Sequence, residues 1–260
     1  MATNPSIPPQ ISQAPSQPSL ETPLLSEGQR LLDTFIAPSK AFTDLRRNAS
    51  WWAPFLIIAI VSLSFVYVVD QKVGFRKVVE NIIQLQPKQA EKIDNLPAGQ
   101  RQQVMQQQAT VTKIISYSIP VIAVIIYAVF AGVLFATLKF GASADLKYKT
   151  LFALIVYTRL PQLLSTILAM LSLVAGVSSD GFNIENPVAT NLGYFIGPEG
   201  SAVLRTLLTP LDIFNLWSLI LTAIGITCIS KVKRSTAFAV VFGWFALVVI
   251  VRMAIAAATS

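Results

Sequence analysis

Three ionisable residues lie within long apolar runs of this 260-residue chain: Arg159, Asp212 and Arg252. A charged side chain at the centre of a bilayer costs about 3 kcal/mol on insertion scales. Such a side chain therefore faces the interior of a helix bundle, pairs with an opposite charge or extends to the interface. Residues of this kind serve relays, ion pathways and ligand sites, but they also form structural ion pairs. These three side chains are the first candidates for either role.

The surroundings of the three residues suggest partners. The topology described below places Asp212 and Arg252 at similar depth on neighbouring spans, so we expect an ion pair that fixes helix register or belongs to a relay or ligand site. Arg159 stands two residues before Pro161, whose missing N–H frees the carbonyl of Tyr157. Arg159 could bind freed carbonyls or a lipid phosphate, and a role in transport is the alternative.

Residue types needed for most enzyme chemistry are missing from the sequence. It contains no histidine, which is the commonest general base and metal ligand, and its single cysteine, Cys228, excludes an intramolecular disulfide. HExxH, Walker and GxSxG motifs are also absent. We therefore expect no enzyme activity, with no catalytic residue, no metal site and no cofactor site.

The composition indicates a membrane protein. Hydrophobic residues make up 53% of the chain and charged residues 13%, whereas soluble domains carry about 25% charged residues. The net charge is +7, and the basic residues mostly flank apolar runs without interleaved aromatic residues. This placement favours contact with lipid head groups and argues against nucleic-acid binding.

The apolar runs predict an all-α, polytopic bundle of about five transmembrane helices. The first run is long enough at 1.5 Å per residue to cover about 28 Å of hydrocarbon, and Trp51 and Trp52 at its start are expected interfacial anchors. Pro120, Pro161 and Pro210 are expected to kink the second, third and fourth spans. The five expected spans are residues 51–69, 114–138, 151–174, 207–230 and 237–258.

The segments outside the spans differ in character. Residues 1–25 are rich in Pro and Ser and predict a disordered tail, which leaves 26–260 as the membrane domain. Residues 26–48 predict two short amphipathic helices, separated at Pro38, that lie in the membrane interface. Within 70–113 we expect one helix that ends before Pro87 and another over 98–112 that continues into the second span.

Lysine and arginine residues predict the orientation. They cluster before the first span, between the second and third, and between the fourth and fifth, so these three segments share a side. The positive-inside rule places that side in the cytoplasm together with the N-terminus. The loop at 175–206 and the C-terminus then lie outside. The basic segment 70–113 also falls outside and is the exception to the rule.

Four short segments resemble the Yip family in their order and spacing, and in particular its bacterial branch. They are FIAPSKAF at 35–42, WWAPFL at 51–56, RLP at 159–161 and LDIFNLWSLIL at 211–221, the last leading to Ile224 and Gly225. The resemblance implies a five-helix domain in a bacterial cell membrane with a cytoplasmic N-terminus. Eukaryotic members associate with Ypt/Rab GTPases, but the Asp-Leu-Tyr-Gly motif typical of them is missing here, so Rab binding is not carried over.

Two classes of function fit these observations. The first is a non-enzymatic module that organises the lipid bilayer or binds other membrane proteins, including further copies of itself. The second is a small transporter or channel, suggested by the charged residues and prolines within the spans. A water-accessible cavity that reaches Arg159 would favour transport, whereas a dry, packed bundle would favour the module.

Overall fold

The computed structural model describes residues 24–176, 178–197 and 200–259, and every regular element in these ranges is helical. The fold class predicted from the sequence is therefore confirmed. Residues 1–23 of the disordered tail predicted over 1–25 lie outside the described residues.

Four helical segments are long and apolar enough to cross a membrane: α3, α7 with the π-helical turn η1, α8 with α9, and α12. A fifth crossing forms if the pair α10 and α11, bent by 48°, counts as one span. The bounds are α3 Trp52–Lys72, α7 Ile119–Ala136, η1 Thr137–Gly141, α8 Tyr148–Thr158, α9 Gln162–Val174, α10 Ala202–Leu208, α11 Ile213–Ile229 and α12 Arg234–Thr259.

Two of the predicted spans begin later than the sequence suggested. The run 114–138 is divided at Ser118, where α6 (Ala98–Tyr117) ends, because Pro120 cannot donate a backbone hydrogen bond. The predicted fourth span, 207–230, is not one straight helix. Residues 209–212 separate α10 from α11, and Pro210 lies in this break. The apolar composition runs through both breaks, so composition alone did not locate them.

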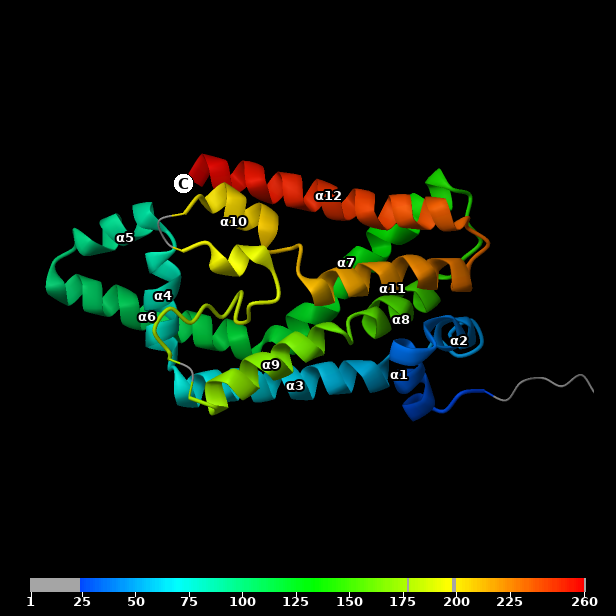
Figure 1. The fold of residues 1–260 in the computed structure, drawn as a ribbon, viewed down its shortest axis with the longest axis horizontal. Coiled ribbons are helices and arrows are strands. Elements are labelled where there is room, and N and C mark those ends of the chain that lie inside the picture. Colours follow the sequence, from blue (N-terminus) through cyan, green and yellow to red (C-terminus); the bar gives the residue numbers. More distant parts are fainter. Residues whose placement is uncertain (1–23, 177, 198–199, 260) are drawn as a thin grey trace, which may run out of the picture.

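The connecting segments gather at two opposite ends of the bundle (Figure 1). One end carries α1 (Glu27–Ile36), α2 (Pro38–Asp44), η1 and the turn between α11 and α12. The other carries α4 (Phe75–Gln84), α5 (Pro87–Asp94), most of α6, η2 (Leu192–Phe195), α10 and the C-terminal end of α12. The connecting segments therefore alternate between the two ends in the order that the lysine and arginine residues predicted.

Helix α8 forms the centre of the bundle. All its residues from Thr150 to Thr158 are buried. On one side α11 approaches closely, because a Cβ atom at Gly225 would lie 2.2 Å from Cδ1 of Leu154. The hydroxyl of Thr222 on α11 donates to the hydroxyl of Thr158 at 2.9 Å. The middle of the bundle is thus filled by close-packed side chains.

The N-terminal helices α1 and α2 cover one end of this bundle. Ala41, Phe42 and Leu45 are fully buried against it, so much of the apolar surface expected to face lipid faces protein. Leu32 and Ile36 of α1 stay 67% and 80% exposed. The two short helices predicted within 26–48 are present, each with one face packed against the bundle. That they lie in the membrane interface stays a prediction.

Candidate functional site

Arg159 lies in the break between α8 and α9, as the proline pattern predicted. Its guanidinium carbon is 5.4 Å from the ring centre of Phe130 and 5.8 Å from that of Tyr127, both on α7. Its Nε atom is buried and has no hydrogen-bond partner among the described residues. The aromatic rings, and not the carbonyls freed by Pro161, are the contacts that stabilise this charge.

Asp212 is the N-cap of α11. One carboxylate oxygen accepts hydrogen bonds from the backbone N–H groups of Phe214 at 2.9 Å and Asn215 at 3.1 Å. The other oxygen accepts from the hydroxyl of Thr190 in the loop that precedes α10. These bonds satisfy free N–H groups at the helix start and tie the loop to the bundle.

The expected ion pair between Asp212 and Arg252 does not form. Among the described residues, no acidic group lies within ion-pair distance of Arg252, which is exposed near the end of α12. The two residues were also predicted to lie at similar depth, and they do line one cavity of about 390 Å³. The pairing argument was wrong because it ignored that aspartate is a favoured N-cap residue and that Asp212 directly precedes α11.

The two helix breaks meet in a polar contact that the sequence reading missed. Nε2 of Gln162, the first residue of α9, donates to Oδ1 of Asn215 at 3.1 Å. Asn215 in turn donates from Nδ2 to the carbonyl of Pro210 at 2.8 Å. Both side chains line the cavity of Asp212 and Arg252. The sequence feature that could have indicated this contact is an amide side chain a few residues after the proline of each break.

The two tryptophans at the start of α3 behave differently. Trp52 is 54% exposed, which fits the expected interfacial anchor. Trp51 packs edge-on against Phe55 and Phe152, with ring centres 5.5 and 5.2 Å away. Trp51 therefore joins α3 to α8.

A third group of charges was not predicted. Arg30 of α1 is fully buried, and its Nη2 and Nε atoms donate to Oδ2 of Asp44 at 2.7 and 3.1 Å. Its Nη1 donates to the hydroxyl of Tyr157 at 3.5 Å, and that hydroxyl donates to Glu27 at 3.0 Å. Burial alone would lower the pKa of Arg30, but its hydrogen bonds to Asp44 and Tyr157 outweigh burial and raise it. This charged cluster fastens α1 and α2 to α8.

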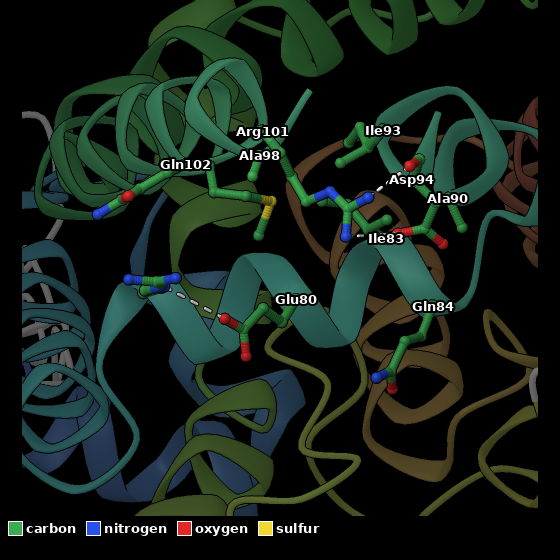
Figure 2. A pocket seen from close by; sticks show the side chains of 11 residues that line it. Glu80, Ile83, Gln84, Ala90, Ile93, Asp94, Ala98, Arg101 and Gln102 are labelled. Atoms are coloured by element: carbon green, nitrogen blue, oxygen red, sulfur yellow. Dashed lines mark hydrogen bonds and ion pairs between the residues drawn. The ribbon is translucent and has the colours of Figure 1, made fainter. Parts of the chain in front are cut away.

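A cavity of about 520 Å³ lies among α4, α5 and α6, away from the spans (Figure 2). Its charged groups are already paired with one another: Arg101 contacts Asp94 at 3.6 Å and Arg76 contacts Glu80 at 3.3 Å. Figure 2 shows Glu80 and Arg101 on opposite walls, with Ile83 and Ile93 nearby. Because these pairs are self-contained and exposed, the cavity has no unsatisfied charge to select a ligand.

The N-cap geometry gives a prediction that separates Asp212 from Arg252. Replacing Asp212 by alanine should lower the free energy of unfolding by about 0.5–2 kcal/mol, because two N–H groups of α11 lose their acceptor. Replacing Arg252 by glutamine should change stability by less than about 0.5 kcal/mol. Thermal unfolding of the two variants in detergent measures the difference. If both single variants lost the same stability and the double variant recovered it, the result would support the rejected ion pair between Asp212 and Arg252.

These helices, with four or five apolar crossings and connections at two opposite ends, define a multi-pass helical membrane protein. The model of the Yip1 domain matches residues 32–255, and the chain belongs to this family. The family named from the sequence is thereby confirmed. No curated protein and no solved structure matches the chain.

Proposed function

We propose that this chain is a non-enzymatic module that binds other proteins or organises lipid in a bacterial cell membrane, with α1 and α2 on the cytoplasmic side. The observation that carries the proposal is the filled centre of the bundle. Helix α8 is buried along Thr150 to Thr158, and Gly225 and Thr222 of α11 pack directly on it. A close-packed contact of this kind argues against an aqueous route for a solute between α8 and α11.

The end that carries α1 supplies a surface for such a partner. Leu32 and Ile36 lie one helical turn apart and are largely exposed, and α1 is held rigidly by the buried contacts of Arg30. Phe140 of η1, at the same end of the bundle, is 82% exposed. Exposed apolar side chains on a fixed helix are typical of binding surfaces.

Transport remains the second candidate because of one observation. The cavity lined by Gln162, Asn215 and Asp212 lies where two helices are broken, which is the kind of place where transporters bind solutes. The cavity borders α9, and Arg159 is not among the residues that line it. A carrier would have to open the packed contact between α8 and α11.

Purification from native membranes tests the proposal. We expect the tagged protein to retain a specific membrane-protein partner, and the double variant L32S/I36S to lose it. Replacing Leu171, an exposed residue on α9 near the other end, by serine should leave the partner bound. Two results together would reject the interaction module in favour of transport. They are the absence of any partner whose binding depends on Leu32 and Ile36, and solute flux in proteoliposomes that depends on Gln162.

A further inference from the structure

Arg159 carries a charge that the described part of the structure does not neutralise. No carboxylate in that part lies within ion-pair distance of it, and its buried Nε atom has no acceptor there. The rings of Tyr127 and Phe130 attract the guanidinium from one side, but they accept none of its hydrogen bonds. The guanidinium therefore retains donors for an acceptor that comes from elsewhere.

The depth of Arg159 limits which acceptor can reach it. Arg159 follows Tyr148, the first residue of α8, by 11 residues, which is about 16 Å along a helix axis. A hydrocarbon core is about 30 Å thick, so Arg159 lies near its centre. The phosphates of lipid head groups lie outside this core, about half its thickness away. An acceptor carried by another transmembrane helix is therefore favoured over a lipid head group.

Arg159 lies on the side of α7 that faces α12. Its ring contact Phe130 stands seven residues before Thr137, which is about two helical turns, so both residues lie on one face of α7. Thr137 accepts a hydrogen bond from Nε1 of Trp244 on α12 at 3.0 Å. The same face of α7 thus meets α12 at Thr137 and Arg159 at Phe130.

The corresponding face of α12 is uncovered beyond this contact. Val241 is fully buried, and Trp244 is partly buried against the bundle. Val248 and Val251 stand two turns further along the same face, yet they are 53% and 50% exposed. Helix α12 runs along the edge of the bundle (Figure 1). This apolar surface, on the side of α12 that faces α7, can receive a further transmembrane helix.

A second copy of this chain does not supply the missing acceptor. The acidic residues within the described spans are Asp70, near the end of α3, and Asp212, in the break before α11. Asp70 contacts Lys113 at 2.8 Å, and Asp212 is engaged by its capping bonds. Neither carboxylate lies in the middle of a span with free acceptors. The matching group therefore belongs to a different membrane protein.

We propose that Arg159 pairs with a glutamate or aspartate in the middle of a partner protein's transmembrane helix, which lies against α7 and α12. A carboxylate can accept two parallel hydrogen bonds from the guanidinium, and the low dielectric between packed helices strengthens their attraction. Acidic residues at this depth are rare, so the contact also selects its partner. The contact rests on the proposed interaction module and gives the chemistry of its partner within the membrane.

Designed single-span peptides in phosphatidylcholine liposomes test this contact. Three leucine–alanine helices differ only in carrying a central glutamate, a central glutamine or a glutamate near one end. Energy transfer between a fluorophore on the C-terminus of the protein and one on the peptide measures binding. We expect the central-glutamate peptide to bind about tenfold more tightly than the other two, the usual strength of a polar contact between transmembrane helices.

Variants of Arg159 and one control locate the contact. R159Q should bind the three peptides equally, and it should still insert, because losing the charge lowers the cost of burying the span. R252Q removes an exposed arginine outside the proposed contact and should keep the preference of the wild type. R159E should prefer a fourth peptide with a central lysine, and this exchange of charges would support the contact independently of R159Q.

Three results would overturn the contact. They are equal binding of the three peptides by the wild type, an unchanged preference in R159Q, and loss of the preference when phosphatidylglycerol is added, since a head group would then occupy Arg159. The proposed module fails by a different result, the absence of a native partner that depends on Leu32 and Ile36. If that partner is retained by R159Q and the peptides bind equally, the module stands and the intramembrane ion pair falls.

Discussion

Replacing Asp44 by alanine should lower the free energy of unfolding by about 3–5 kcal/mol, the typical cost of leaving one member of a buried ion pair alone. Arg30 has no exposed surface, and Asp44 is its closest acceptor, at 2.7 Å. Glu27 contacts Arg30 at 3.4 Å and is partly exposed, so it should compensate only in part. Arg30 carries its charge throughout the physiological pH range, so the loss should not depend on pH there.

Thermal unfolding in detergent measures this prediction, and two variants act as controls. Replacing Arg76 by alanine removes an exposed ion pair with Glu80 and should cost less than about 1 kcal/mol. The double variant Arg30→Met with Asp44→Leu should regain much of the loss, since an apolar pair leaves no charge buried. If losses at Arg30 and Asp44 simply add, the two residues do not stabilise each other and α1 is held by apolar contacts alone.

The buried polar face of α1 explains why the sequence did not reveal this cluster. Periodicity assigns the apolar residues of an amphipathic helix to the protein interior. In α1 the buried residues are Arg30, Asp33 and Thr34, whereas Leu32 and Ile36 are exposed. Arg30 becomes a core residue only because Asp44 and Tyr157 approach from two other helices. Contacts over 14 and 127 residues of sequence carry no local signal.

The spans and their breaks were more accessible to sequence analysis. Long apolar runs are required to cross a bilayer, and prolines interrupt helices for a local steric reason, so both features can be recognised from neighbouring residues. Pro120, Pro161 and Pro210 lie at or beside the observed breaks. The partners of the charged residues could not be predicted from neighbouring residues in the same way. Asp212 had a local alternative in the N–H groups of α11, and that alternative was realised in place of Arg252.

Replacing Gly225 by alanine should lower the free energy of unfolding by about 1–3 kcal/mol, the usual cost of adding a group to a packed core. The new Cβ would lie 2.2 Å from Cδ1 and 3.0 Å from Cγ of Leu154, and Leu154 is fully buried. Leu154 therefore cannot turn aside without displacing its neighbours on α8. Alanine favours helix more than glycine by up to about 1 kcal/mol, which offsets only part of the clash.

Gly132 in α7 provides the matched control, because a Cβ there would meet no atom within 4 Å. Replacing Gly132 by alanine should leave stability unchanged or raise it by about 0.5–1 kcal/mol through helix propensity alone. A double variant with Leu154→Ala and Gly225→Ala should lose less than the sum of the single losses, since each change makes room for the other. Thermal unfolding of the four variants in one detergent gives the comparison. Additive losses would mean that α11 and α8 are not in direct contact at Gly225, and the packed centre on which the proposed function rests would be lost with that contact.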